Sequence, residues 1–293
     1  MWQVIEREIT AVTGAPFRVR DSTAIGGGCI NDAVCLRDEN RTFFVKLNRA
    51  EWLSMFAAEA AGLAAIRATA TVRAPEPVAW GTDGQRCWLA LEFIEFAAAT
   101  GDTEARLGEQ LAAMHRTGGD RFGWDRDNTI GSTPQPNPWT SQWPQFFQEQ
   151  RLGFQLALAR DNGLTRGVVD RGELLLASLP AFFSDYRPVP SLLHGDLWGG
   201  NWSADGEGRP VLFDPAVYFG DREADLAMTG LFGGFGERFY RAYNAAWPLD
   251  DGYATRKVLY NLYHVLNHFN LFGGGYDTQA RDMVERLLAE LGR

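Results

Sequence analysis

The sequence predicts an α+β fold with two lobes, a small one over residues 1–96 and a larger one over residues 97–293. In the first third of the chain, short runs of β-branched and aromatic residues alternate with Gly- and Asp-rich turns, which is typical of an antiparallel sheet. From Thr103 onward, apolar residues recur at helical spacing instead. We therefore expect a five-stranded antiparallel small lobe and a mainly helical large lobe.

The small lobe should begin with an amphipathic helix over residues 2–13, which Gly14 and Pro16 end. A second helix is expected over residues 51–69, where the composition is rich in Ala and an apolar stripe recurs at helical spacing. The five expected strands cover about residues 17–25, 33–36, 42–47, 78–81 and 87–94. Residues 97–101 then lead into the large lobe.

The large lobe should be built mainly from helices. They are expected near residues 103–116, 143–158, 171–183, 225–231, 236–247, 254–272 and 278–291. The stretch 122–139 is rich in Gly, Pro and Asn, and we interpret it as an ordered loop.

Composition excludes several classes of function. The net charge of −9 argues against a general nucleic-acid or anionic-membrane binder, since both need a positive surface. Uninterrupted apolar runs of about 18 residues, which a membrane span needs, do not occur, and the N-terminal residues carry charges where a signal peptide needs an apolar run. Three sparse cysteines form neither a disulfide framework nor a zinc pattern. A reducing, cytoplasmic compartment is expected.

The most informative stretch is Leu193–Asn201, which reads LHGDLWGGN. It places Asp196 five residues before Asn201, and Asp214 follows at the end of an apolar run. Phosphoryl transfer from ATP needs this set, because one carboxylate orients the attacking hydroxyl while an amide oxygen and a second carboxylate hold Mg²⁺. We assign Asp196 as the catalytic residue and Asn201 and Asp214 as Mg²⁺ ligands. The pKa of Asp196 need not be raised, because a loose transition state makes little early demand for proton transfer.

This motif also predicts a protein-kinase-like fold. In protein kinases the loop reads His-Arg-Asp, with Asn five residues after the Asp, and the metal-binding Asp opens Asp-Phe-Gly. Here Gly195 stands in place of the Arg and Pro215 in place of the Phe. An Asp and an Asn at this spacing also occur by chance in solvated loops, but the whole string followed by Leu-Phe-Asp is specific.

A Gly-rich turn near the start of the chain is a candidate phosphate-binding loop. Glycine leaves the backbone open to close approach, so its N–H groups can bind phosphate oxygens. The candidate residues are Gly26, Gly27 and Gly28. A Gly-rich hairpin is more often only a turn, and no Walker A lysine follows this one.

Lys46 raises the significance of that turn. It lies near the end of an apolar strand, and Glu59 follows thirteen residues later on the expected helix. A Lys held by a Glu of the next helix can contact the α- and β-phosphates of ATP. Glu51 is the alternative partner, and a strand-end lysine that reaches solvent is the alternative interpretation. At the end of the fifth strand, backbone groups near Glu92, Phe93 and Ile94 are expected to bind adenine.

Three residues in or near the catalytic stretch have supporting roles. His194 is expected to fix the loop by a hydrogen bond, and Asp225 to accept backbone N–H groups of the loop, although Asp225 could also be a plain surface carboxylate. Trp198, two residues after Asp196, could stack on the acceptor, with ordinary packing as the alternative.

The remaining His and Cys residues give weaker indications. His115 is interpreted as the end of a helix, and His264 and His268 as aromatic packing rather than metal ligands, because no third ligand is evident. Cys29, in the Gly-rich turn, could be an oxidisable thiol that inhibits activity, but a small residue that fits the turn is the simpler interpretation.

These motifs resemble the fructosamine/ketosamine-3-kinase family across essentially the whole chain. The resemblance is carried by LHGDLWGGN, FDPA and YFGDREADLAM, by GGGCI in the small lobe, and by residues 122–152 with FGW and WPQFF. The 122–152 block separates this family from the related aminoglycoside phosphotransferases and choline kinases.

The resemblance implies ATP-dependent phosphorylation of the sugar 3-hydroxyl of a ketosamine, a sugar–amine adduct that is free or protein-bound. In the family this reaction repairs glycated amines. Two alternatives stay open. One is a small-molecule kinase for an aminoglycoside, choline or thiosugar, and the other is a nucleotide-binding pseudokinase scaffold.

Overall fold

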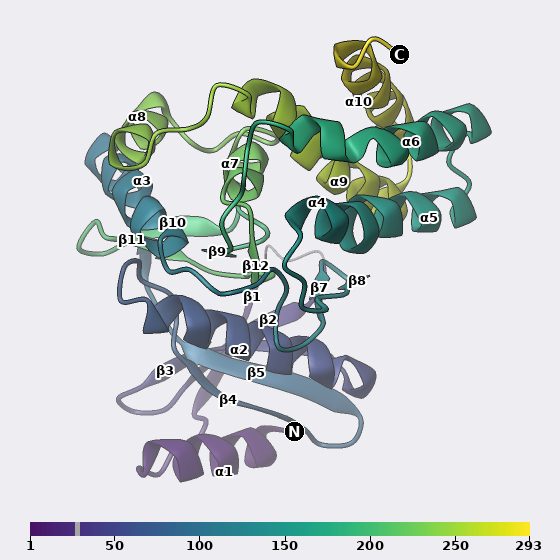
Figure 1. Ribbon diagram of the computed structural model, residues 1–293. Coiled ribbons are helices and arrows are strands. Elements are labelled where there is room, and N and C mark those ends of the chain that lie inside the picture. Colours follow the sequence, from purple (N-terminus) through teal and green to yellow (C-terminus); the bar gives the residue numbers. More distant parts are fainter. Residues whose placement is uncertain (27–29) are drawn as a thin grey trace.

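A computed structural model describes residues 1–26 and 30–293. Gly27, Gly28 and Cys29 lie outside the described residues, so the phosphate-binding and redox expectations for them stay predictions. The chain forms two lobes, with the N-terminus in the small lobe and the C-terminus at the far end of the large one (Figure 1).

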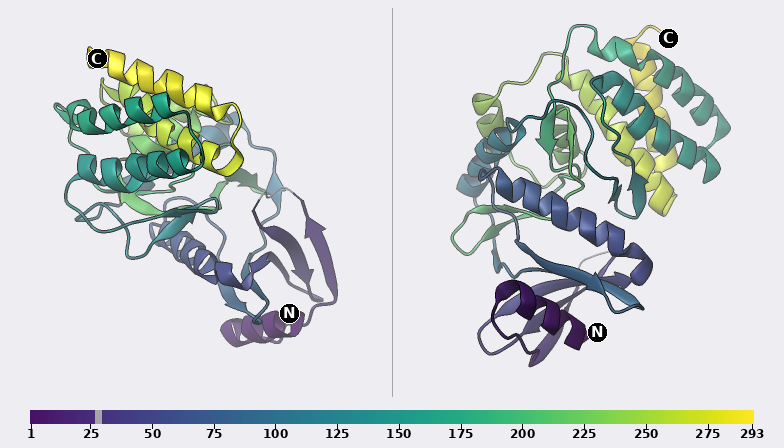
Figure 2. Two further views of the ribbon diagram at one scale, coloured as in Figure 1. Left: turned by 90° about the vertical axis from the view of Figure 1, so that its right-hand side faces the viewer. Right: turned by 60° about the horizontal axis from the view of Figure 1, so that its bottom comes forward.

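The small lobe contains the expected five-stranded antiparallel sheet, with strand order β1-β2-β3-β5-β4. Its elements are α1 Trp2–Thr13, β1 Asp21–Ile25, β2 Asp32–Arg37, β3 Thr42–Arg49, α2 Leu53–Ala68, β4 Pro77–Thr82 and β5 Arg86–Glu92. Helix α2 lies between the sheet and the large lobe, and α1 covers the opposite face (Figures 1 and 2). The α+β fold class is therefore confirmed.

Strand β3 shows why one face of this sheet can carry chemistry. Side chains alternate between the two faces of a strand. Val45 packs with Ile5 and Ile9 of α1, while Lys46, its neighbour, contacts Glu59 of α2. The alternation thus places Lys46 on the face that is turned toward the large lobe.

The large lobe is mainly helical, and short antiparallel β pairs lie beneath the helices (Figure 1). Its helices are α3 Gly101–His115, α4 Trp143–Phe146, α5 Phe154–Asp161, α6 Arg166–Ser178, α7 Glu223–Thr229, α8 Glu237–Ala246, α9 Tyr253–Phe272 and α10 Tyr276–Glu290. Its strands are β7 Asn128–Ile130, β8 Thr133–Gln135, β9 Ser191–Leu193, β10 Trp202–Asp205, β11 Pro210–Leu212 and β12 Tyr218–Gly220.

The connection between the lobes is itself a strand. β6 Phe96–Ala97 pairs with β10, so that Phe96 lies opposite Asp205 and Ala97 opposite Ala204. The proposed division at residues 96 and 97 therefore falls inside a strand that already belongs to a sheet of the large lobe.

Two local predictions need correction. The expected loop 122–139 contains the hairpin β7–β8. Its two strands are three residues long, and they pair across a turn in which Gly131 adopts a positive φ. The expected helix after Trp143 contains a π-helix over Phe147–Gly153, where the missing side chain of Gly153 lets the wider turn close against the Gln148 carbonyl. Neither feature leaves a periodic signal in the sequence.

Within the residues that the structure describes, no helix is both long and apolar enough to cross a lipid bilayer.

Candidate active site

The loop expected to be catalytic, residues 194–201, follows β9 and is held by a carboxylate from helix α7. Asp225 accepts the backbone N–H of His194 at 2.7 Å and that of Gly195 at 2.8 Å. The contact expected of Asp225 is therefore present, and Asp225 is buried rather than a surface carboxylate. Two N–H groups on one carboxylate fix the direction in which the loop leaves the strand.

His194 fixes the other side of the loop. Its Nε2 lies 2.9 Å from the Phe213 carbonyl oxygen, and the Asp196 N–H donates to its Nδ1 at 3.3 Å. Since a carbonyl can only accept, Nε2 carries the proton and Nδ1 is the acceptor. Burial lowers the pKa of His194, so the ring is neutral and holds Asp196 near Phe213 and Asp214.

Gly195 explains one departure from the protein-kinase motif. Its φ is +83°, and a Cβ built there would overlap the carbonyl oxygen of Ala216. The Arg of protein kinases could not occupy this position without moving the segment after Asp214.

One residue behind Asp225 was not predicted from the sequence. His115, which it assigned to a helix end, is fully buried and places Nε2 3.1 Å from Asp225 Oδ2 and Nδ1 2.9 Å from the Tyr243 hydroxyl. A chain of hydrogen bonds thus runs from α8 through α3 and α7 to the catalytic loop. One feature of the sequence could have indicated this role: His115 follows an apolar helix face, where a buried histidine needs hydrogen-bond partners.

The three residues assigned to phosphoryl transfer lie together. The Asn201 side-chain amide donates to the Asp196 carbonyl at 2.8 Å, to Asp196 Oδ2 at 3.1 Å and to the Asp214 carbonyl at 3.4 Å. All three bonds are donated by the amide nitrogen, so they fix the orientation of the Asn201 side chain. The amide oxygen has no hydrogen-bond partner among the described residues and remains available as a ligand.

Lys46 joins this cluster from the small lobe. Its ammonium donates to Glu59 at 2.5 Å and to Asp214 at 2.7 Å. Burial alone would lower the pKa of Lys46, but the carboxylates of Asp214 and Glu59 outweigh it and the pKa is raised. The ammonium is thus charged and has a third N–H for a phosphate oxygen. The alternative partner Glu51 pairs with Arg49 instead.

Asp196 differs from the expectation in its protonation. Burial and the nearby negative charges of Asp214 and Asp225 raise the pKa of Asp196 to about 7, although the hydrogen bond from Asn201 opposes the shift. A raised pKa makes the carboxylate a better proton acceptor near neutral pH. The main physical cause is removal of the carboxylate from water, and the neighbouring carboxylate of Asp214 adds to it.

The donor set fits Mg²⁺. Asn201 offers an amide oxygen, and Asp214, with a side chain 47% exposed, offers a carboxylate. Magnesium prefers oxygen ligands and is usually held by one or two protein groups together with water and substrate phosphates. No cluster of three or more His, Cys, Asp or Glu side chains suited to a metal occurs in the described ranges, so a dedicated all-protein metal cage is not present there.

Aromatic rings flank the catalytic loop on its outer side. Trp198 is 39% exposed and lies edge-to-face with Phe232, with ring centroids 6.4 Å apart. Gly200 leaves room for the Trp198 ring, because a Cβ at position 200 would overlap that ring. Phe232 in turn packs on His268, with ring centroids 4.6 Å apart. Trp198 is thus partly exposed and partly packed on Phe232, and its contact with the acceptor stays a prediction.

The two other histidines behave as expected. His264 is buried, its pKa falls to about 3, and its ring packs edge-to-face on Tyr263. His268 packs among Phe232, Phe272 and Tyr276. Their place in an aromatic cluster supports packing over metal binding.

The proposed adenine site is only partly free. The Glu92 N–H donates to the Glu76 carbonyl at 2.8 Å, and the Glu92 carboxylate is paired with Arg73. This N–H is therefore not available to adenine, and backbone contacts at Phe93 and Ile94 stay predictions.

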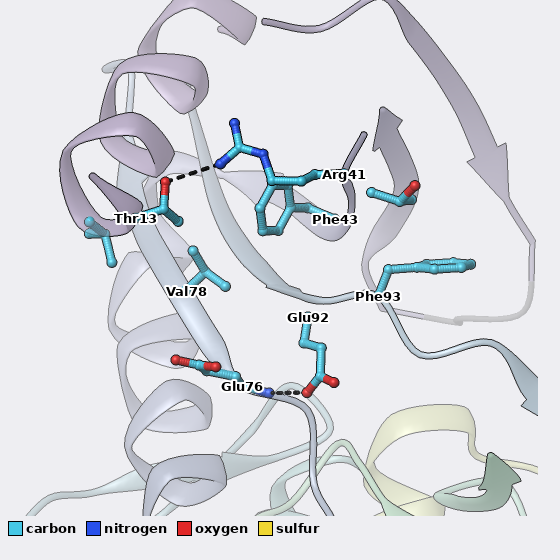
Figure 3. Close-up of a pocket in the computed structure, with 9 residues that line it drawn as sticks. Thr13, Arg41, Phe43, Glu76, Val78, Glu92 and Phe93 are labelled. Carbon is cyan, nitrogen blue, oxygen red and sulfur yellow. Dashed lines mark hydrogen bonds between the residues drawn. The ribbon is translucent and has the colours of Figure 1, made fainter. Parts of the chain in front are cut away.

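A hollow of the small lobe is lined by two of the proposed adenine residues, Glu92 and Phe93, together with residues of α1. It measures about 370 Å³ and is lined by residues that include Thr13, Arg41, Phe43, Val78 and Phe93 (Figure 3). Phe43 lies on the α1 face of the sheet, opposite Lys46. This hollow is therefore not the phosphate-binding side of the lobe.

The hairpin β7–β8 supports the segment after Asp214. Asn128 donates to the Val217 carbonyl at 2.8 Å, and Gln135 donates to the Ala216 carbonyl at 3.2 Å. Tyr263 of α9 then donates to Gln135 at 2.6 Å. The 122–152 block thus positions one wall of the site by polar contacts.

Comparison with known proteins agrees with this geometry. The family model described as fructosamine kinase matches residues 1–290. A Synechocystis protein named "Probable ketoamine kinase" is 49% identical over 288 residues, which cover 98% of this chain and 97% of that protein. A chloroplastic protein-ribulosamine 3-kinase of Arabidopsis thaliana is 43% identical, with coverage of 97% and 88%.

Solved structures give the same result. The crystal structure of a protein provisionally called fructosamine-3-kinase, from Haemophilus somnus, superposes with a TM-score of 0.92 at 32% identity and covers 98% of each chain. A choline kinase from Streptococcus pneumoniae superposes with a TM-score of 0.65 at 14% identity, again over 98% of each chain. The second likeness shows the fold alone, and that fold is protein-kinase-like.

Proposed function

Because the chain belongs to the fructosamine kinase family, we propose that it is an ATP-dependent kinase that phosphorylates the sugar 3-hydroxyl of ketosamines. The observation that carries this proposal is the convergence of Lys46, Asp196, Asn201 and Asp214, which come from both lobes and meet within hydrogen-bonding distance. Relatives named ketoamine kinase and protein-ribulosamine 3-kinase support the acceptor class. The role that follows is the repair of glycated amines.

The nucleotide would be held between the lobes. Lys46, oriented by Glu59, is placed to contact phosphate oxygens with its third N–H. Gly26 lies at the start of the proposed phosphate loop, and Gly27 and Gly28 would continue it. Residues 1–96 would thus supply the nucleotide site, and residues 97–293 the catalytic loop and the acceptor site. Bound Mg²⁺, held by Asn201 and Asp214, would neutralise the charge of the phosphates.

Asp196 performs the protein's part of the chemistry. Its carboxylate orients the sugar hydroxyl and accepts the hydroxyl proton as the phosphoryl group is transferred. Asn201 holds that carboxylate at Oδ2, which would leave Oδ1 for the acceptor hydroxyl. His194 and Asp225 keep the loop in place through backbone contacts.

Trp198 is the proposed contact for the acceptor. Its exposed ring lies two residues from Asp196, and carbohydrate and amine groups pack well on exposed indole faces. The physiological partner would be a sugar–amine adduct, either a small molecule or a glycated protein. The sparse cysteines support a reducing, cytoplasmic location for this activity.

The test is ATP consumption with Mg²⁺ against a panel of ribulosyl-lysine, fructosyl-lysine, an aminoglycoside and choline. Turnover of the ketosamines is expected. Turnover of the aminoglycoside or choline alone would overturn the acceptor class, and ATP binding without turnover of any acceptor would indicate a pseudokinase.

A further inference from the structure

The segment between α2 and β4 joins the small lobe to a hairpin of the large lobe. The carbonyl of Arg73 accepts the N–H of Leu212 at 2.9 Å, and Arg73 forms a parallel bridge with Val211. Both partners belong to β11, in the sheet that lies next to the catalytic loop. The backbone at Arg73 therefore keeps a fixed position relative to the large lobe.

The Arg73 side chain extends this connection to the end of β5. Its Nη2 donates to Glu92 Oε1 at 2.7 Å, and its Nη1 donates to Asp205 Oδ2 of β10. A guanidinium is planar and presents its N–H groups in a fixed fork. One rigid group therefore links a carboxylate of the small lobe to a carboxylate of the large lobe.

Asp205 is a firm anchor for this link. Its Oδ1 accepts the N–H groups of Glu207 at 3.0 Å and Arg209 at 2.9 Å, and its Oδ2 also accepts Arg209 Nε at 2.8 Å. Its side chain is 3% exposed. A buried carboxylate with so many donors cannot turn without losing several of them.

The residues after Glu92 are held from the same hairpin. The second oxygen of Glu92 accepts the Glu76 N–H at 3.2 Å (Figure 3). Beyond residues 93–95, β6 pairs with β10, and Phe96 stacks on Phe213 with ring centroids 5.0 Å apart. Phe213 directly precedes Asp214. The short connection is thus fixed at both ends to the strands that carry the metal-binding side of the site.

We propose that Arg73 is a positioning residue for the adenine end of the nucleotide. By tying Glu92 to Asp205, it sets the position of the backbone at residues 92–94 relative to Asp196 and Asp214. The inference rests on the nucleotide site proposed above. Arg73 itself touches neither the reacting atoms nor the acceptor, so its loss changes nucleotide affinity and leaves acceptor affinity unchanged.

The test compares Arg73→Ala and Arg73→Lys with Arg209→Ala. Arg209 is a matched control because it also donates to Asp205 but does not contact Glu92. Arg73→Ala is expected to raise KM for ATP about tenfold while KM for ribulosyl-lysine changes less than about twofold. Arg73→Lys should recover part of the ATP affinity, and Arg209→Ala should keep both constants near those of the parent.

Equal increases in both KM values, or the same effect from Arg209→Ala, would show a merely structural role and overturn the proposal. If Arg73→Ala does not fold, Glu92→Gln weakens the same link from the other side, and an unchanged KM for ATP in that variant would also overturn it. ADP affinity, measured by calorimetry on parent and variants, separates this inference from the proposed function. A parent that binds ADP but turns over no acceptor refutes the kinase proposal alone.

Discussion

Asp196 and Asp205 are carboxylates of the same lobe, and the protein shifts their pKa values in opposite directions. Burial pushes both pKa values up. At Asp205, the backbone N–H of Arg209 and the guanidinium groups of Arg209 and Arg73 outweigh burial and hold the pKa well below its usual range. Among the described residues, the Asp196 carboxylate accepts a side-chain hydrogen bond from Asn201 alone, and its pKa rises to about 7.

The difference separates a structural carboxylate from a chemical one. Asp205 has its lone pairs filled by donors and can only hold the chain in place. Asp196 keeps lone pairs free beside a second carboxylate, which costs stability but leaves an acceptor for a substrate proton. The number of donors around a buried carboxylate, more than burial itself, therefore indicates its task.

Asp196→Asn should give the largest effect and tests the chemical side of this comparison. Loss of the proton acceptor is expected to lower kcat by about 10³-fold. Nucleotide affinity should stay close to that of the parent, and Tm should not fall, because the variant removes a poorly paired negative charge. Steady-state kinetics, ADP calorimetry and thermal unfolding check these outcomes. Near-normal turnover would contradict the role assigned to Asp196.

Lys46→Met tests the contact that joins the two lobes. Removing a preorganised cation from the phosphate site should lower kcat/KM for ATP by about 10²-fold. The matched control is Lys257→Met, because Lys257 lies on α9 and has no contact with the carboxylates of the site. Both variants are measured by ATP turnover with ribulosyl-lysine. A similar loss in the two variants would indicate a general effect of charge rather than a phosphate contact.

Gly195→Ala tests the backbone that carries Asp196. A side chain at φ +83° is strained, and its Cβ would overlap the Ala216 carbonyl. The free energy of unfolding should fall by roughly 2–3 kcal/mol. Gly206→Ala, at a position with open space around a Cβ, should change it little. Denaturant unfolding measures both, and equal values would show that the loop relaxes without cost.

Asp205→Asn should give the smallest effect and tests the structural side. Because the pKa of Asp205 is lowered in the folded state, its contribution to stability is present above the ordinary carboxyl pKa of about 4 and is lost as pH falls below it. The variant should be less stable than the parent by about 1–2 kcal/mol at pH 7. The difference in free energy of unfolding should narrow as pH falls from about 4 toward 2. A gap that does not depend on pH would mean that the charge of Asp205 is not what the donors stabilise.

Several parts of the molecule could be predicted because their signals are local. The five strands and most helices follow from alternation and helical spacing over short windows. Asp196 and Asn201 lie in one loop, so their spacing alone predicts that they meet. The pairing of Lys46 with Glu59, thirteen residues apart on a strand and the next helix, follows from the expected order of elements.

Other contacts leave no local signal. His115 lies 110 positions from Asp225, and Arg73 lies 132 positions from Asp205. Such pairs form because two distant segments pack together, and neither periodicity nor spacing records that. Backbone groups near Glu92 were expected to bind adenine, but the Glu92 N–H donates to the carbonyl of Glu76, just before the neighbouring strand β4.

The sequence by itself determined which chemistry the protein can perform, since that depends on residue types held at short spacing within one loop and one strand. Only the tertiary structure decided the protonation of Asp196, the anchoring of Asp225 by His115 and the link from Glu92 to Asp205. These depend on burial and on donors from distant segments, and the energy of a charge is set by what surrounds it in space.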